Sequence, residues 1–436
     1  MSMNLVNLNV NPCKMCMPMG SVSAFCGVKG CMTLLHGSQG CSTYIRRHMA
    51  THYNEPIDIA SSSLTEEGTV FGGEKNLIKG LENLIRLYNP EVIGVATTCL
   101  AETIGEDIPR MIRDFQANHP QHNVKIIPVS SSGYSGTQYE GFFAALKAIV
   151  QFTEMKKEKH GKVNIITGML SPADTRYLKR LLADLEIDYI LLPDLSENLD
   201  GIYKENYDRL PGGGTSLEEI SQMAGSRLSV ELSAFVGEEA SPAKYLYDRY
   251  GVPYVRCNPP VGLRDTDAFL GILKGSLDEL PDSIKKERGR FLDAMVDSHK
   301  YNAEGKAVVY GEPDFVYGIA RLCMENGITP VVTATGSACG NLRELLEDQI
   351  RQVSERFFIE DFIVTDVCDF DHIEHYAREY GANLMVGNSD GRRIEEKLGI
   401  PLVRCAFPVH DHVGGQRVRT LGYEGSLTLL DRITNT

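Results

Sequence analysis

Short apolar runs alternate with amphipathic stretches along most of the chain, and this pattern limits the fold more than any other feature. The run EVIGVATTC at 91–99 is rich in β-branched residues, whereas NLIKGLENLIRLY at 76–88 has apolar residues at helical spacing. Between 162 and 194 follow a buried-strand run, a helix expected to begin near Ser171 with Pro172 in its first turn, and a second apolar run. Such strand–helix–strand units build parallel sheets, so the sequence predicts an α/β fold.

The same unit returns later in the chain, at 306–337 and 361–388. The late strands GVPYVRCNPP at 251–260 and GIPLVRCAFP at 399–408 also resemble each other. A chain of 436 residues has room for about three domains. We therefore predict three Rossmann-like domains with parallel sheets. They are an N-terminal domain at 1–155, a second domain at 156–295 and a third at 296–436, with a long helix leading into the last.

The charge and hydropathy of the chain limit its partners. The formal net charge is −14, and phosphate binding requires clustered Lys and Arg, so we expect no nucleic-acid partner. No secretory signal is visible at the start. The apolar run GFFAALKAIVQF is interrupted by Lys147 and falls short of the roughly 20 residues that span a membrane. We expect a cytoplasmic protein with no membrane partner.

The eleven cysteines are unevenly placed, and they are too few for a disulfide scaffold. In a reducing cytosol they should be thiols unless something binds them. Six lie within the first 99 residues: Cys13, Cys16, Cys26, Cys31, Cys41 and Cys99. The other five are scattered, and we expect them to be small buried side chains: Cys257, Cys323, Cys339, Cys368 and Cys405.

The residues alone leave several uses of the early cysteines open. Four of them follow the spacing C-x2-C-x9-C-x4-C, beginning at Cys13, which loosely matches a zinc site. Alternatively, Cys41 could be a nucleophile paired with a histidine from the set His36, His48 and His52. A purely structural role for all of them is also open.

An iron–sulfur cluster is the remaining alternative, with Cys16, Cys41 and Cys99 as thiolate ligands. Soft thiolates suit such clusters, and neighbouring glycines let backbone amides approach the sulfurs. Cys99 directly follows a buried strand, which is where an open parallel sheet presents its ligands.

Several long motifs decide between these alternatives by resemblance. HGSQGC at 36–41, SSSLTEEGTVFGG at 61–73, ATTCLAETIGEDI at 96–108 and FPVHDHVGGQRVRTLGYEGSLTLLDRITN at 407–435 occur in this order. Together they resemble the β-type subunits of the nitrogenase superfamily over nearly the whole chain. The resemblance implies the nitrogenase component 1 fold, with three Rossmann-like domains in each subunit, and assembly with an α-type subunit in an α2β2 heterotetramer.

The same resemblance implies a cofactor and its ligands. In that family three β-subunit cysteines hold half of an [8Fe-7S] cluster at the interface with the α-type subunit, and their motif positions here are Cys16, Cys41 and Cys99. A [4Fe-4S] cluster is the alternative. Thr137 falls near a position where a serine can add a ligand, and whether Thr137 or Cys13 contributes stays open. None of these residues is expected to be catalytic in its own right.

The resemblance also implies a second partner, an ATP-dependent homodimeric [4Fe-4S] reductase protein. Phe71 matches a residue on the face that receives this reductase. No Walker A sequence occurs in the chain, so any ATP hydrolysis must be carried out by the partner.

The type of complex follows from two further features. The region at 229–255, where α-type subunits carry the cysteine of the active-site metallocluster, has no cysteine, so the chain is β-type. Only 15 residues precede Cys16, whereas the molybdenum nitrogenase β subunit usually has a long N-terminal extension before its first ligand, so this class is disfavoured. We therefore expect the electron-relay subunit of a nitrogenase-like oxidoreductase, with carbon–sulfur bond reduction as one candidate reaction. The alternatives are the N-type subunit of the cofactor-assembly scaffold, a catalytic nitrogenase β subunit, and a non-catalytic structural subunit.

Overall fold

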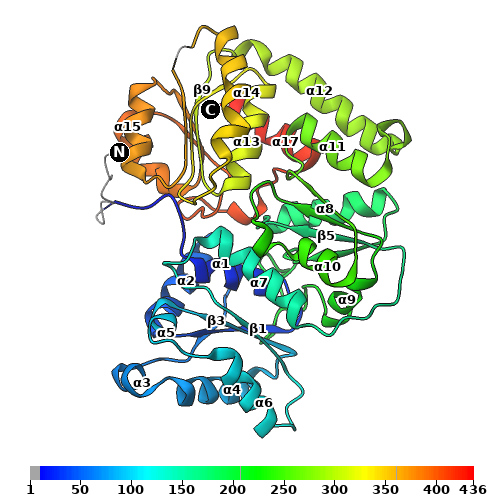
Figure 1. The fold of residues 1–436 in the computed structure, drawn as a ribbon. Helices are drawn as coiled ribbons and strands as arrows, with labels where there is room; N and C mark the ends of the chain where they lie inside the picture. Colours follow the sequence, from blue (N-terminus) through cyan, green and yellow to red (C-terminus); the bar gives the residue numbers. More distant parts are fainter. Residues whose placement is uncertain (1–9, 207, 360) are drawn as a thin grey trace. The chain divides into compact units, whose positions relative to one another are not determined.

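The structure is a computed structural model that describes residues 10–206, 208–359 and 361–436 (Figure 1). Packing groups these residues into two compact units. The first unit contains the described part of the segment up to Met15, together with Pro259–Gly415 and Arg419–Thr436. The second unit contains Cys16–Asn258 and Gln416–Val418.

The second unit begins with a four-stranded sheet in which every strand pair is parallel. The order is β2 (Ile59–Ser61), β1 (Cys31–His36), β3 (Val92–Thr97) and β4 (Lys125–Val129). Its core forms against α4 (Glu74–Tyr88) and α6 (Ile108–Asn118), which bury apolar residues at helical spacing. In α4 these are Leu77, Leu81 and Leu84, which confirms the helix predicted at 76–88.

Helices α1 (Met17–Cys26) and α7 (Gln138–Phe152) pack closely within the same unit (Figure 1). Glycines make the approach possible. A Cβ at Gly20 would lie 1.8 Å from the carbonyl oxygen of Gln138, and one at Gly141 would lie 2.0 Å from that of Met17. The hydroxyl of Ser21 also donates a hydrogen bond to the Gly141 carbonyl at 3.0 Å.

A second four-stranded parallel sheet completes this unit. Its order is β6 (Tyr189–Leu192), β5 (Val163–Thr167), β7 (Leu228–Leu232) and β8 (Tyr254–Cys257). The helices are α8 (Pro172–Asp184), α9 (Leu217–Gln222) and α10 (Pro242–Tyr250). The Ser171 hydroxyl caps α8 by accepting from the Asp174 amide at 2.9 Å, so this helix begins where the sequence predicted.

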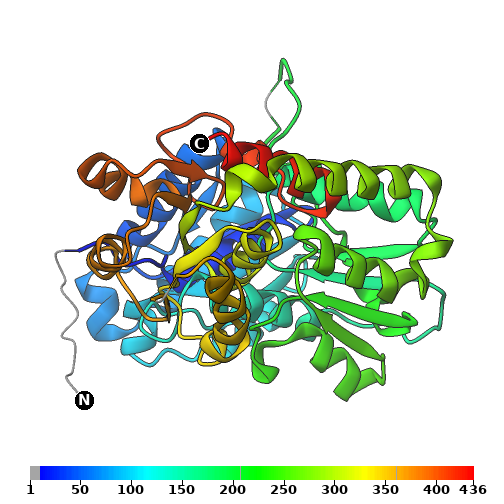
Figure 2. The ribbon, with the colours of Figure 1, turned by 90° about the horizontal axis from the view of Figure 1, so that it is seen from above.

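The first unit has a five-stranded parallel sheet. Its order is β11 (Ile363–Thr365), β10 (Thr329–Ala334), β9 (Lys306–Tyr310), β12 (Leu384–Gly387) and β13 (Leu402–Arg404). The helices are α11 (Gly262–Lys274), α12 (Asp282–Asn302), α13 (Pro313–Glu325), α14 (Leu342–Arg356), α15 (Phe370–Glu379), α16 (Arg392–Leu398) and α17 (Gly422–Thr434). The long helix α12 packs against α17 at the end of the chain (Figures 1 and 2).

The three parallel sheets confirm the predicted α/β class. One sheet falls within each of the predicted ranges 1–155, 156–295 and 296–436, whereas packing groups the chain into two units. The division into three domains therefore stays a prediction. In the part of the chain that the structure describes, no helix is both long enough and apolar enough to cross a membrane.

Candidate functional site

Three segments meet where the strands of the first sheet end. Because parallel strands end at the same edge, the residues that follow β1, β3 and β4 lie together there. Cys41 lies in the first turn of α2 (Gln39–Tyr53), which follows β1. Cys99 is the first residue of the short helix α5 (Cys99–Thr103), which follows β3. Gly133 lies in the loop that follows β4.

Cys16 reaches this edge from the start of the second unit. It is the N-cap residue of α1, and its backbone forms an isolated antiparallel bridge with Thr137. A Cβ at Gly133 would lie 2.6 Å from the Cys16 Sγ and 3.4 Å from the Cys99 Sγ, so only glycine fits between the two sulfurs. The Gly133 amide donates a hydrogen bond to the Cys99 Sγ at 3.1 Å.

The Cys16 thiol lies close enough to Cys99 and to Cys41 to be affected by their charges. Burial, and after it the charges of the Cys99 and Cys41 thiolates, raise the pKa of Cys16 to about 11, against a hydrogen bond from the Met17 amide. Three thiolates this close repel one another unless a cationic centre neutralises them. Cys16 and Cys41 also sit at the positive N-terminal ends of α1 and α2, which favour negative sulfur.

Hydrogen bonds fix the Cys99 side of the site. The Ser131 amide and hydroxyl bond to the hydroxyl and carbonyl of Thr97, each at 2.9 Å. The Glu102 carboxylate accepts from Thr97 at 2.5 Å and from Ser130 at 2.6 Å. The loop that carries Gly133 is thereby held against the end of β3. The thiols themselves remain accessible, since Cys16 and Cys41 are half-buried and Cys99 is exposed.

The residues present fit an iron–sulfur cluster. Soft sulfur ligands, a backbone amide directed at one sulfur and a glycine that leaves the space between two sulfurs open are features that such clusters use. In the described residues, no group of three His, Cys, Asp or Glu side chains could hold a single metal ion. That result is consistent with a polynuclear core, because iron and sulfide atoms separate the ligands of a cluster.

The zinc interpretation is not supported by the described residues, because its four cysteines do not form a metal-holding group. Cys13 lies buried in the core of the first unit beside Cys368, and Cys26 and Cys31 flank the start of β1. Of the five scattered cysteines expected to be buried, only Cys323 and Cys368 are fully so, and the rest are half-buried.

The interpretation of Cys41 as a nucleophile paired with a histidine is not supported by the contacts of the described residues either. The polar contact of the Cys41 Sγ is the Ser38 hydroxyl at 4.0 Å rather than a histidine. His36 instead bonds through Nε2 to the Glu106 carboxylate, and His48 packs against the Tyr44 ring.

Both residues considered as additional ligands already have hydrogen-bond partners, and whether either contributes stays open. The Thr137 hydroxyl hydrogen-bonds to the Glu140 carboxylate in a capping box that begins α7. The Cys13 thiol hydrogen-bonds to the buried Cys368, an arrangement in which the pKa of Cys13 rises well above its usual value.

The residue predicted to dock a partner is on the surface. Phe71 is the last residue of α3 (Glu66–Phe71), and its side chain is 84% exposed, next to Val70 at 74%. Two adjacent apolar side chains with this exposure are suited to a protein contact.

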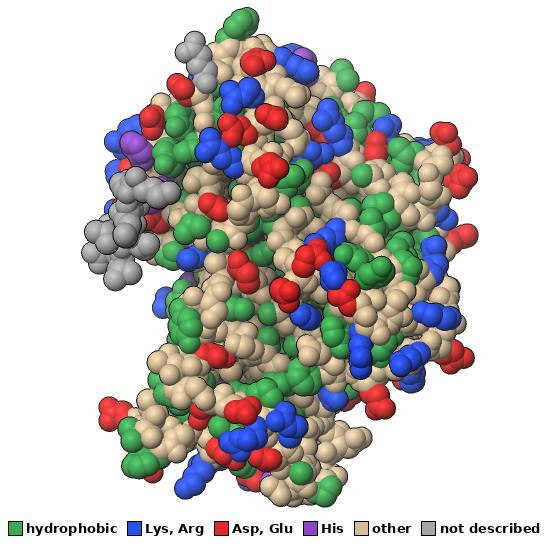
Figure 3. Space-filling model, viewed as in Figure 1, with side chains coloured by type: hydrophobic (Ala, Val, Ile, Leu, Met, Phe, Trp, Pro, Cys, Tyr) green, Lys and Arg blue, Asp and Glu red, His purple; other side chains and the backbone are tan. Residues whose placement is uncertain are grey.

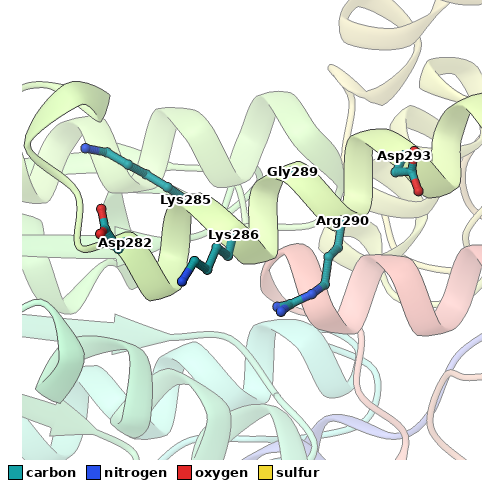
Figure 4. A pocket seen from close by; sticks show the side chains of 6 residues that line it. All are labelled: Asp282, Lys285, Lys286, Gly289, Arg290 and Asp293. Carbon is teal, nitrogen blue, oxygen red and sulfur yellow. The ribbon is translucent and has the colours of Figure 1, made fainter.

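Other surface features are less specific. A shallow hollow runs along α12, where Lys285, Lys286 and Arg290 lie between Asp282 and Asp293 (Figure 4). All of its lining residues come from one exposed helix, and no cysteine or histidine is among them. On the face shown in Figure 3, acidic and basic side chains are interspersed rather than gathered by sign.

Sequence reasoning missed two residues of this region. Gly133 occurs in the run SSGYSG after a buried strand, and this run was the only available signal. Glu106 is part of the quoted motif ATTCLAETIGEDI, yet nothing in the spacing indicated that its carboxylate would be buried against His36.

The chain belongs to the family described as nitrogenase component 1 type oxidoreductases, whose model matches residues 16–436. Within it, the chain is similar to β chains. It is 36% identical to the nitrogenase molybdenum-iron protein beta chain of Methanococcus maripaludis, over 98% of this chain and 94% of the relative. The corresponding chain of Clostridium pasteurianum is 33% identical, and the vanadium-iron protein beta chain of Trichormus variabilis is also 33% identical, each over 98% of this chain and 93% of the relative.

A solved structure supports the same assignment. A chain of the structure titled "Nitrogenase Cp1 at pH 6.5" matches with a TM-score of 0.92 and 33% identity, covering 100% of this chain and 94% of that chain. The fold is thus the nitrogenase component 1 fold, and the chain is a nitrogenase-type β subunit of component 1. The molybdenum-iron beta chains of Methanococcus maripaludis and Clostridium pasteurianum are spanned to 94% and 93%, so a short segment before the first ligand does not separate this chain from those two relatives.

Proposed function

We propose that this β subunit holds its share of an interface iron–sulfur cluster through Cys16, Cys41 and Cys99, and so relays electrons within an ATP-driven nitrogenase-type reductase. The proximity of the Cys16 thiol to Cys99 across Gly133, and to Cys41, at a surface that leaves Cys99 exposed, carries the proposal. An exposed thiol beside two half-buried ones is suited to a site that a second subunit completes. An α-type subunit, in an α2β2 heterotetramer, would supply that half.

When bound, the cluster would supply one-electron redox chemistry, as an [8Fe-7S] core or alternatively a [4Fe-4S] core. The residues of this chain would set its surroundings. The positive ends of α1 and α2 would stabilise the thiolates of Cys16 and Cys41. The Gly133 amide would keep its hydrogen bond to the Cys99 sulfur, and such bonds tune a cluster's reduction potential.

The electrons would come from a homodimeric [4Fe-4S] reductase protein that hydrolyses ATP. We propose that it docks on the exposed pair Val70 and Phe71. The relatives' names favour dinitrogen as substrate of the complex, because both molybdenum-iron and vanadium-iron beta chains are among them. Carbon–sulfur reduction and service as a cofactor-assembly scaffold are the competing outcomes.

Iron and sulfide analysis tests the cluster. The complex is purified without oxygen together with its α-type partner, with each of the three cysteines changed in turn to alanine. Each substitution should lower the iron and sulfide content and alter the cluster's electron paramagnetic resonance signal. The matched control is Cys339→Ala, a half-buried cysteine of the first unit, which should change neither. Full iron content in all three variants would refute the proposal.

Turnover tests the reaction. The complex is supplied with its reductase protein and ATP, and then with dinitrogen, acetylene or a methylthio-alkane. Ammonia and ethylene formation would identify a nitrogenase, and release of methanethiol a carbon–sulfur reductase. If none is reduced and a bound cofactor instead activates an apo-nitrogenase, the complex is an assembly scaffold and the relay proposal is wrong.

A further inference from the structure

The carboxylate of Glu106 joins three segments that are distant in sequence. One of its oxygens bonds to the His36 Nε2 at the end of β1, and the other accepts from the amide of Gly73, the N-cap residue of α4 in the turn that follows α3. Glu106 itself follows α5, the helix that begins with Cys99. The His36 side chain is fully buried and that of Glu106 is 5% exposed, so this contact lies inside the second unit.

The Gly73 side of the contact belongs to the exposed apolar turn. Phe71 and Val70 precede it, and Gly72 adopts a left-handed φ of 92°. A Cβ at Gly73 would lie 2.9 Å from both Glu106 carboxylate oxygens and 2.4 Å from the Leu64 side chain. The turn therefore rests directly on the buried carboxylate, and no side chain separates them.

The His36 side of the contact belongs to the segments that carry the thiols. The His36 carbonyl accepts from the Thr98 amide at 3.0 Å, immediately before Cys99. Gly37 begins the segment that leads to Cys41, and a Cβ on it would lie 1.8 Å from the Thr98 hydroxyl oxygen. A shift of His36 would therefore displace both segments that carry the cysteines, because such tight packing transmits strain.

The contact is also costly for the fold. A buried carboxylate usually has a cationic partner, whereas this one faces an imidazole and an amide. Burial lowers the pKa of His36 against the opposing effect of Glu106, so the ring is neutral and donates through Nε2. Its Nδ1 is buried without a hydrogen-bond partner in the described residues. The carboxylate accepts from both donors at once, which an uncharged amide could not do, because its nitrogen is itself a donor.

We propose that Glu106, acting with His36, is a positioning residue that transmits docking of a protein partner at Phe71 to the segments Gly37–Cys41 and Thr98–Cys99. This inference rests on the proposed function and specifies how docking and the cysteine ligands are coupled. In the redox step, the reductase protein's cluster loses one electron and the interface cluster gains it. Glu106 contributes by setting the position of the thiol segments and exchanges no electron itself.

The test compares Glu106→Gln, which keeps the shape but removes the charge and one of the two acceptor oxygens, with the matched control Asp114→Asn. Asp114 is an exposed carboxylate on α6 that pairs with Arg110 of the same helix. Hydrogen exchange is measured on the complete complex, with and without the reductase held in its ATP state by a non-hydrolysable ATP analogue. Docking should change exchange in peptides covering 36–41 and 98–103 in the wild type and in Asp114→Asn, and this change should be lost in Glu106→Gln.

Kinetics give the second measurement. Iron content and reduction of the cluster by a small-molecule reductant should be unchanged in Glu106→Gln. Electron flux driven by the reductase should fall at least about fivefold, the lower end of typical site-to-site coupling, with more ATP hydrolysed per electron. In the double variant Glu106→Gln with Phe71→Ala, the fold-reduction in electron flux should be smaller than the product of the two single reductions, because both residues act through one link.

An unchanged flux, a retained exchange response or a multiplicative double variant would each overturn the proposal. If Glu106→Gln fails to assemble, Glu106→Asp keeps the charge on a shorter side chain and is judged by the same criteria. Loss of iron in that variant as well would assign Glu106 a purely structural role. A wild-type complex that lacks iron or ignores the reductase would instead refute the proposed function, so the two failures are distinguishable.

Discussion

A single absent methyl group at Gly133 leaves the space between two sulfurs open. Gly133→Ala would place a Cβ 2.6 Å from the Cys16 Sγ, closer than such contacts ever come, so the sulfurs must move apart. We expect the variant to fold but to lose cluster iron, because thiolate ligands tolerate little displacement. Iron analysis of the purified complex together with circular dichroism would show this.

The control is Gly237→Ala in the same unit, since that glycine has ordinary backbone angles and nothing within 4 Å of the added Cβ. Full iron content in Gly133→Ala would mean that the thiols do not surround this position when the cluster is bound.

A buried ion pair in the first unit predicts acid sensitivity. Burial would raise the pKa of Asp411, but hydrogen bonds from Arg404 and Ser389 outweigh it and lower the pKa to about 2. An unfolded aspartate titrates near ~3.9, so this pair stabilises the fold fully above that pH and loses its effect as pH falls towards 2. Asp411→Asn should cost about 3 kcal/mol at pH 7, because Arg404 is left buried with fewer acceptors.

The difference in the free energy of unfolding between wild type and Asp411→Asn should stay constant from pH 7 to pH 5 and become smaller below about pH 4. Hydrogen exchange of peptides covering 384–404, measured across this range, would report it. The exposed pair of Arg392 and Glu396 offers the control, and Glu396→Gln should have little effect at any pH. A gap that widens in acid would contradict the assignment.

At the scale of elements, the sequence allowed the regular structure to be predicted and left the site incomplete. Hydrophobic spacing placed α4, and a serine followed by proline placed the start of α8, because these signals are local. The end of β3 indicated Cys99 as a ligand, because parallel strands present residues at that edge. The position of Cys16 depends on the packing of α1 against α7, which no local pattern encodes.

The residues that sequence reasoning missed share one physical reason. Gly133 matters for the side chain that it lacks, and Glu106 matters for partners about 70 and 33 positions away, namely His36 and Gly73. Neither property leaves a periodic signal. The cysteine ligands themselves were named through resemblance to a family, since the residues alone left zinc, nucleophile and cluster open.

Two glycines in helices predict opposite effects on stability. Gly20→Ala would drive a Cβ to within 1.8 Å of an α7 backbone oxygen and should destabilise the second unit by about 3 kcal/mol. Gly289→Ala, on the open face of α12, meets nothing within 4 Å and should stabilise the first unit by about 0.5–1 kcal/mol. Thermal unfolding of the two variants should shift in opposite directions. If Gly20→Ala left the stability unchanged, α1 and α7 could move apart without destabilising the second unit.

At the scale of the whole molecule, the chain presents two features that are suited to contacts with other proteins. The thiol site leaves Cys99 exposed, and α3 exposes adjacent apolar side chains. Glu106 lies between these features and contacts the turn beside one and the strand end beside the other. A subunit that relays electrons would need both surfaces, one for the protein that shares the cluster and one for the protein that reduces it.

The docking surface gives the last prediction. Phe71→Ala removes a ring that is 84% exposed, so the fold and the iron content should not change. The contact with the reductase should weaken by about 2 kcal/mol or more, as for an aromatic residue at the centre of an interface. The concentration of reductase that gives half-maximal electron flux should therefore rise roughly 30-fold, since each ~1.4 kcal/mol corresponds to a factor of ten.

Tyr203→Ala is the matched control, because that aromatic side chain is 91% exposed in the same unit but lies outside α3. It should leave the half-maximal concentration unchanged. Titrating the reductase against each variant at saturating ATP separates weaker docking from a slower electron transfer at saturation. If Phe71→Ala lowers only the saturating flux, the ring acts after docking. If neither quantity changes, the reductase approaches this subunit elsewhere, and the apolar turn at α3 has another occupant.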